Sequence, residues 1–111
     1  MTISWYAVAI DCVDARTVAA FWHDATGWPI AAESSDTRVV LHPGGGLPQV
    51  TFNTVPEPKA TKNRLHLDVT TDDFTAEADR LVKLGATRLR DFDGWSTFAD
   101  VENNEFDLIG S

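Results

Sequence analysis

An imidazole and a carboxylate stand two residues apart in the segment KNRLHLDV, which runs from Lys62 to Val69. In a strand, side chains two residues apart leave the same face of the sheet, so His66 and Asp68 would lie side by side. The residues that alternate with them are apolar: Leu65, Leu67 and Val69. Such a pair could supply nitrogen and oxygen ligands to a divalent metal ion, or it could transfer protons as an acid–base couple. The alternation predicts that the apolar face packs under a helix and the polar face carries the chemistry.

The elements that would position this pair are expected to occur in the same order twice. Asp14 and Gly27 have the residue types of a helix N-cap and a helix stop, and the segment between them carries an apolar stripe. Asp72 or Thr71 and then Gly85 repeat these signals. Strands are predicted over 5–13, 30–33, 37–42 and 49–54 in the first half, and over 65–69, 87–92, 96–99 and 106–109 in the second.

The two halves are matched in register as well as in order. The cap residues Asp14 and Asp72 are 58 positions apart (72 − 14), and so are the glycines Gly27 and Gly85 (85 − 27). This spacing predicts an α+β fold of two βαβββ modules. Module one would cover about 4–55, a polar linker 56–63, and module two about 64–110, all within a single domain formed by residues 1–111.

Composition limits the classes of partner. Nine Lys and Arg against 17 Asp and Glu give a formal net charge of −8, which argues against nucleic acid. Two interpretations of the acidity stay open: it serves solubility alone, or it attracts a cationic ligand. Cys12 is the single cysteine, so no disulfide forms within the chain. That fits a reducing cytoplasm, and the sequence shows neither a signal peptide nor an apolar segment of membrane-spanning length.

Four segments together resemble a known superfamily: AAFWHDATGW, VPEPKATKNRLHLDV, RLVKLGAT and ADVENNEFDL, which span most of the chain between Ala19 and Leu108. They resemble the vicinal oxygen chelate superfamily, which includes glyoxalase I, extradiol dioxygenases, and the fosfomycin and bleomycin resistance proteins. More narrowly, the chain is similar to small bacterial glyoxalase-like domain proteins. The resemblance implies a curved mixed sheet around a cavity, with the helices on its convex face.

The resemblance also implies where a metal would bind. Metal-dependent members hold the ion at inward positions on the first and last strand of each module. These positions correspond here to Ala7 (or Ala9), Gln49, His66 and Asp107. His66, Gln49 and Asp107 could hold Mn, Fe, Ni or Zn with water in the open positions. Alanine cannot bind metal, and the loss of a ligand is typical of members that no longer use one, so no obligatory metal cofactor is expected.

The same inward positions predict an acidic cavity with aromatic walls. By resemblance, carboxylates converge there with an imidazole and two tryptophans; the expected ligand-binding residues are Trp5, Asp11, His66, Asp68, Trp95, Glu105 and Asp107. Such a cavity suits a cation or a hydrogen-bond donor. The alternative is structural, in which Asp68 binds Arg64 or nearby backbone, and Lys62 pairs with a surface carboxylate.

These features lead to a first hypothesis and two alternatives. The first is a cytoplasmic small-molecule-binding protein of the glyoxalase/bleomycin-resistance type. The second is a metal-dependent lyase, isomerase or dioxygenase in which His66 and Asp107 hold the ion and Glu105 or Asp68 acts as the base. The third is a metal-free enzyme that uses His66 and Asp68 as an acid–base pair. The few strands of each module leave edges to cover, so a homodimer is expected.

Overall fold

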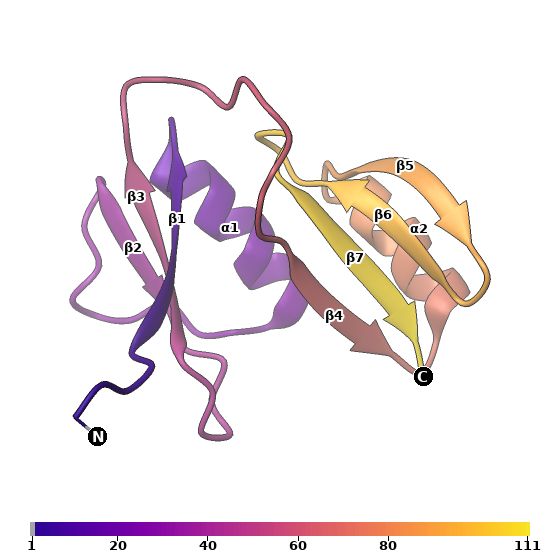
Figure 1. The fold of residues 1–111 in the computed structure, drawn as a ribbon, viewed down its shortest axis with the longest axis horizontal. Helices are drawn as coiled ribbons and strands as arrows, with labels where there is room; N and C mark the ends of the chain where they lie inside the picture. Colours follow the sequence, from indigo (N-terminus) through magenta and orange to yellow (C-terminus); the bar gives the residue numbers. More distant parts are fainter. Residues whose placement is uncertain (1) are drawn as a thin grey trace. The chain divides into compact units, whose positions relative to one another are not determined.

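The computed structural model describes residues 2–111, which form two compact units that divide between Pro58 and Lys59 (Figure 1). The first unit contains β1 (Ala7–Cys12), α1 (Ala15–Thr26), β2 (Arg38–Leu41) and β3 (Gln49–Thr54). The second contains β4 (Leu67–Thr71), α2 (Phe74–Lys83), β5 (Thr87–Phe92), β6 (Trp95–Ala99) and β7 (Glu105–Gly110). The predicted α+β class is confirmed, since each unit joins one helix to its own mixed sheet.

The first unit follows the predicted order of strand, helix and strands. Its sheet has the order β1-β3-β2, with β1 parallel and β2 antiparallel to β3. Asp14 caps α1 by accepting a hydrogen bond from the Thr17 backbone, and Gly27 ends the helix in the left-handed conformation at φ 77°. Trp22 is 2% exposed, which confirms its prediction as a core residue.

The strand predicted near 30–33 is wrong. Among the described residues of this segment, the only sheet pairing is one isolated bridge between Ile30 and Leu41. The backbone N–H of Ser34 donates to the carbonyl of Ala31 (3.1 Å), which closes a turn at the point where a strand would have to continue. β1 also begins at Ala7 rather than residue 5, so the first unit has three paired strands.

The second unit has the full predicted βαβββ order, with sheet order β4-β7-β6-β5. α2 packs on one face of this sheet (Figure 1), where an added side-chain carbon at Gly110 would lie 3.7 Å from Phe74. Phe98, Phe106 and Leu108 are buried in this unit's core. The opposite face of the sheet, called here the polar face, carries the candidate site.

Two local expectations for the second unit are wrong. Asp73, rather than Asp72 or Thr71, caps α2, because its carboxylate accepts from the Ala76 N–H (3.4 Å) while the Thr71 hydroxyl accepts from Asp73 itself. β4 begins at Leu67, so Leu65 precedes the strand and is 88% exposed instead of packing under a helix.

The turn between β6 and β7 is built around a buried carboxylate. Asp100 is 3% exposed, and its Oδ1 accepts hydrogen bonds from the backbone of Glu102 (2.8 Å) and Asn104 (3.1 Å). Asn103 has φ 69°, a conformation that asparagine tolerates better than other residues with a side chain. This turn fixes the pairing of β6 with β7, the strands that carry much of the polar face. No helix among the described residues is long and apolar enough to cross a membrane.

Candidate functional site

Strand register brings the polar-face residues together from distant parts of the second unit. β4 runs parallel to β7 with Asp68 beside Asp107, and β6 runs antiparallel to β7 with Thr97 beside Asp107. These side chains share one face because each lies on the opposite parity to the buried Phe98 and Phe106. The pair predicted from local alternation thus gains a carboxylate and a hydroxyl that are distant in the sequence.

His66, Asp68 and Asp107 form a compact cluster. The His66 Nδ1 lies 2.7 Å from Asp68 Oδ1 and 3.6 Å from Asp107 Oδ2. One nitrogen or oxygen atom from each residue lies within 4.8 Å of those of the others. The side chain of Asp107 is 13% exposed, against 45% for His66 and 50% for Asp68. A ligand therefore has access from the side of His66 and Asp68, while Asp107 forms the base of the cluster.

Thr97 controls the orientation of Asp107. Its hydroxyl donates to Asp107 Oδ1 at 2.8 Å, and Oδ2 is the oxygen nearer to His66. Thr97 was not among the residues selected from the sequence. The signal that could have found it is its parity: Thr97 alternates with the core residue Phe98 and so shares a face with Trp95.

The donor set of the cluster fits a divalent metal ion. One imidazole nitrogen and two carboxylate oxygens are suitable ligands for Mn, Fe, Ni or Zn. With metal–ligand bonds near 2.1 Å, adjacent ligands around an octahedral ion are about 3 Å apart. The distances from His66 Nδ1 to Asp68 Oδ1 and to Asp107 Oδ2, 2.7 and 3.6 Å, lie on either side of that value. The same cluster can equally receive an ammonium group or donate and accept hydrogen bonds.

Glu105 lies on the polar face but is held in a separate ion pair. Lys62 Nζ is 2.8 Å from Glu105 Oε2, Arg90 Nη2 is 3.7 Å from the same oxygen, and the Asn63 side chain donates to the Glu105 carbonyl. The hydrogen bond from Lys62 holds the pKa of Glu105 below its ordinary value of 4.5, although burial acts to raise it. A carboxylate with a lowered pKa is a weaker base, and Lys62 already occupies this one, so the geometry argues against Glu105 as the base. It also confirms that Lys62 pairs with a carboxylate.

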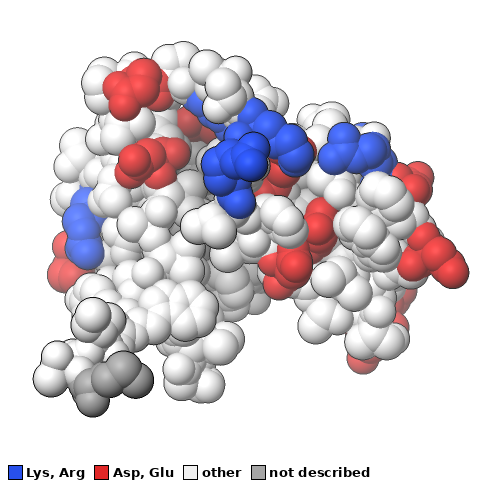
Figure 2. Space-filling model, viewed as in Figure 1, with Lys and Arg blue, Asp and Glu red and all other residues white. Residues whose placement is uncertain are grey.

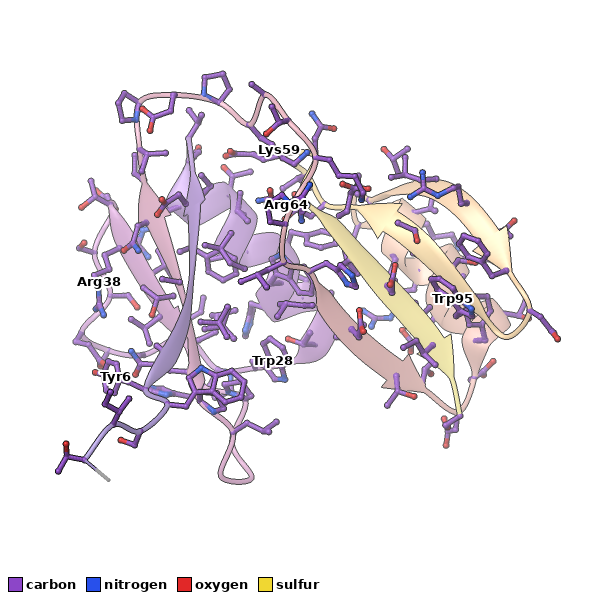
Figure 3. All side chains as sticks on the ribbon, in the orientation of Figure 1. Tyr6, Trp28, Arg38, Lys59, Arg64 and Trp95 are labelled. Carbon is purple, nitrogen blue, oxygen red and sulfur yellow. The ribbon has the colours of Figure 1, made fainter. Side chains whose placement is uncertain are left out.

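An aromatic pair lies at one end of the polar face. Trp95 stacks on Phe92 with ring centroids 4.0 Å apart and planes 15° apart, at the turn between β5 and β6 (Figure 3). Ile109 pairs with Trp95 across the sheet and continues the apolar surface. Phe92 is 46% exposed and was not selected from the sequence, because its contact with Trp95 depends on the hairpin register.

The other sequence-predicted residues belong to the first unit. Asp11 and Gln49 share a face of the first sheet, since Ala7 pairs with Gln49 and Asp11 pairs with Asn53. Trp5 precedes β1 and is 73% exposed, and its indole N–H donates to the Ala7 carbonyl. Their participation in one site with His66 stays a prediction.

Charges of both signs lie close together around the segment that leads into β4. In Figure 2, Lys and Arg side chains gather over this segment, and Asp and Glu side chains lie next to them. Figure 3 places Lys59 and Arg64 on the same segment. Asp68 pairs with His66 at 2.7 Å, whereas the structural alternative paired it with Arg64 or nearby backbone. The negative charge of Asp68 is therefore part of the cluster with His66.

Comparisons with solved structures show the same fold in proteins of several activities. A fosfomycin resistance protein, FosX, from Mesorhizobium loti is similar to this chain with TM-score 0.76 and 18% identity, over 100% of this chain and 94% of that one. FosX from Listeria monocytogenes, solved as a variant with Mn(II) and a dihydroxypropylphosphonic acid, has TM-score 0.76 and 14% identity over 100% and 93%. TnmS3, an antibiotic-binding protein from Streptomyces, has TM-score 0.69 and 19% identity over 99% and 98%.

At these identities the structural likeness shows the fold alone, and no curated protein sequence matches the chain. The family assignment comes from the sequence of the chain itself. Residues 7–109 match the family described as "Glyoxalase-like domain". The match covers nearly the whole chain, and the structural neighbours are members of the superfamily that the sequence resembles. This protein therefore belongs to the glyoxalase-like domain family.

Proposed function

We propose that this protein binds a small molecule carrying a positive charge or hydrogen-bond donors, in the manner of the glyoxalase/bleomycin-resistance proteins and without an obligatory metal. The observation that carries the proposal is the convergence of His66, Asp68 and Asp107 on the polar face of the second unit. The likeness to TnmS3, an antibiotic-binding protein of the same fold, supports it.

The electrostatics of the cluster favour a cationic group. Asp68 and Asp107 bring two carboxylates against one imidazole, and Asp107 is largely removed from water. A charge interaction is stronger where the local dielectric is low, so an ammonium or amidinium group gains most beside Asp107. The stacked Phe92 and Trp95 offer an apolar surface and π-electron density on the same face. A cation over such a ring gains about 0.5–2 kcal/mol.

The remaining parts of the proposal concern the whole chain: its domain organisation, further ligand-binding residues, location and oligomeric state. Residues 1–111 form one domain of two modules, and Trp5 and Asp11 also contribute to ligand binding. The protein acts in the cytoplasm as a homodimer whose partner covers exposed sheet edges. These statements rest on the family resemblance and on the short strands of each unit.

A pair of dyes of similar shape tests the charge preference. Proflavine is a planar cation near neutral pH, whereas acridone is planar and neutral. We expect proflavine to bind at least tenfold more tightly in a fluorescence titration, and Asp107→Asn to remove most of that preference. Asp79→Asn is the matched control, because Asp79 is an exposed carboxylate on α2. Equal affinity for the two dyes, or equal losses in Asp107→Asn and Asp79→Asn, would refute the proposal.

A second candidate is a metal-dependent lyase, isomerase or dioxygenase. Two observations favour it: the metal-compatible donor set and the presence of Mn(II) in a FosX structure of the same fold. A bound ion at His66 and Asp107 would polarise a substrate oxygen, and Asp68 would be placed to accept a proton. Turnover of a thiohemiacetal, catechol or epoxide that disappears in His66→Ala would establish this activity.

A further inference from the structure

We infer that the ligand of this protein is zwitterionic, with its cationic group at the cluster around Asp107 and an anionic group at Arg90. Arg90 lies on β5, at the opposite edge of the sheet from β4. The inference rests on the proposed function, because the carboxylates of the cluster receive the cationic end of the ligand. It adds a second recognition residue and a narrower class of ligand.

Arg90 and the carboxylates of the cluster lie in one row across the polar face. Arg90 of β5 pairs with Thr97 of β6, which pairs in turn with Asp107 of β7. Asp107 then pairs with Asp68 of β4. Directly opposed residues place their side chains on the same face of a sheet, and neighbouring strands are about 4.8 Å apart. The backbones of Arg90 and Asp107 are therefore separated by roughly 10 Å, a span that a small molecule with opposite charges at its two ends can bridge.

A β-bulge directs Arg90 to the polar face. Side chains two residues apart in a regular strand share a face, so Arg88 and Arg90 would ordinarily point the same way. The register of β5 shifts between them: Arg88 pairs with the buried Phe98, whereas Arg90 pairs with a residue of the polar face. Arg88 accordingly lies on the side of α2, with its guanidinium carbon 5.6 Å from the centre of the Phe74 ring. Bulges often redirect a side chain beside a functional site, so this irregularity supports a binding role for Arg90.

The positive charge of Arg90 is only partly balanced by other groups in the described residues 2–111. Its ion-pair partner there is Glu105, whose Oε2 lies 3.7 Å from Arg90 Nη2 and only 2.8 Å from Lys62 Nζ. Two cations thus share one carboxylate. The Arg90 side chain is 56% exposed, and a planar guanidinium can donate two parallel hydrogen bonds to a carboxylate or a phosphate. An anionic group of the ligand would balance the remaining charge.

The stacked aromatic pair indicates what joins the two charged groups of the ligand. Phe92 pairs with Trp95, and Trp95 with Ile109, in the next row of the polar face toward the β5–β6 turn. Two residues along a strand cover about 6.5 Å, so this row lies beside a ring placed over Thr97. A flat apolar middle would bury part of its surface against the pair. The expected order of groups in the ligand is therefore cation, apolar ring and anion.

Three probes built on one ring test this inference. para-(Aminomethyl)benzoate is a zwitterion near neutral pH, its methyl ester is a cation, and para-methylbenzoate is an anion. Because the chain has a formal net charge of −8, non-specific attraction favours the ester. We expect the opposite order in a proton–nitrogen NMR titration, with the zwitterion bound about fivefold more tightly than the ester and para-methylbenzoate bound most weakly. The side-chain Nε–H signal of Arg90 should shift with the zwitterion and stay in place with the ester.

Substitutions at Arg90 identify the cause of the preference. Arg90→Gln should lower the affinity for the zwitterion to that for the ester, and leave the affinity for the ester within twofold. Arg90→Lys should keep part of the preference, because the charge remains while the two-pronged hydrogen bonding is lost. Arg38→Gln is the matched control, since Arg38 is an exposed arginine on β2. A preference that persists in Arg90→Gln, or that falls equally in Arg38→Gln, would overturn the inference.

The inference and the proposed function fail in different ways. If the ester binds the polar face as tightly as the zwitterion, and both are lost in Asp107→Asn, the cationic-ligand proposal stands and the zwitterion inference is wrong. If para-methylbenzoate binds as tightly as the zwitterion, the cluster around Asp107 takes no part in binding and the inference is wrong as well. If no probe shifts the signals of polar-face residues, the inference also fails, and the comparison of proflavine with acridone alone decides the proposed function.

Discussion

Replacing the buried Asp100 should destabilise the protein by removing the acceptor that organises the β6–β7 turn. Its Oδ1 accepts from the N–H groups of Glu102 (2.8 Å) and Asn104 (3.1 Å). The backbone of Asp100 is also bonded within the turn, since its N–H donates to the Asn104 carbonyl and its carbonyl accepts from Asn103. Asp100→Ala deletes the side-chain bonds and leaves the backbone ones in place.

The expected loss follows from the strength of hydrogen bonds to a charged acceptor. Each such bond contributes about 1.5–3 kcal/mol, and water can partly replace the acceptor in a turn, so Asp100→Ala should cost about 2–4 kcal/mol. Asp100→Asn keeps an oxygen at the Oδ1 position, where both N–H groups donate, and should cost about 1 kcal/mol. The specific part of this prediction is that Asp100→Ala loses more stability than Asp100→Asn.

Urea unfolding followed by tryptophan fluorescence measures both losses. A slope of about 2 kcal/mol per molar urea, in the middle of the typical range, converts the alanine loss into a fall of roughly 1–2 M in the unfolding midpoint. Asp93→Ala is the control, because Asp93 is an exposed aspartate in the neighbouring β5–β6 turn. A midpoint for Asp100→Ala close to that of the control would refute the reasoning, and so would an asparagine variant as unstable as the alanine variant.

Three further predictions concern the ion pair, a glycine and the oligomeric state. Lys62→Met should cost about 0.5–1 kcal/mol of unfolding free energy near pH 7, because it removes the partner of Glu105. Since the pKa of Glu105 is lowered in the folded state, that difference should shrink as the pH falls below 4.5 and disappear below the lowered pKa; a difference independent of pH would contradict it. Gly85→Ala should cost about 1–3 kcal/mol, because φ is 114° and the new Cβ would lie 3.0 Å from Val101. Gly94→Ala, at φ 83° with nothing within 4 Å of the new Cβ, should cost less in the same unfolding assay, and equal losses would remove the contact with Val101 as a cause. Light scattering should show a dimer, and a monomer at high micromolar concentration would exclude the homodimer.

The local sequence pattern was sufficient to predict a helix or strand wherever that element could be recognised from its own residues. Apolar periodicity and cap chemistry placed α1, and the strands β3 and β5 run over the predicted residues 49–54 and 87–92. Alternation in KNRLHLDV placed His66 and Asp68 on one face, and the structure joins them at 2.7 Å. The family also follows from the sequence, since the match covers residues 7–109.

Where several local backbone structures have similar energy, the sequence pattern alone predicted the wrong limits for a helix or strand. Adjacent polar residues offered competing caps for α2, and only the bond from Ala76 to Asp73 decided between them. Residues 30–33 were predicted as a strand, but a turn closed by Ser34 leaves only a bridge at Ile30. Exact repetition at 58 positions therefore fails at the second helix, whose cap is 59 positions from Asp14 (73 − 14).

The neighbours of the candidate site were decided by tertiary structure. A strand's alternation determines which face a side chain occupies, but the residue beside it depends on pairing with a strand far away in the sequence. The register of β7 against β4 and β6 places Asp107 between Asp68 and Thr97, and the β6–β7 turn holds that register. For the same reason, the pairing of Glu105 with Lys62, 43 residues away, could not be read from either segment alone. The sequence thus determined which groups face the site, and strand register determined which of them touch.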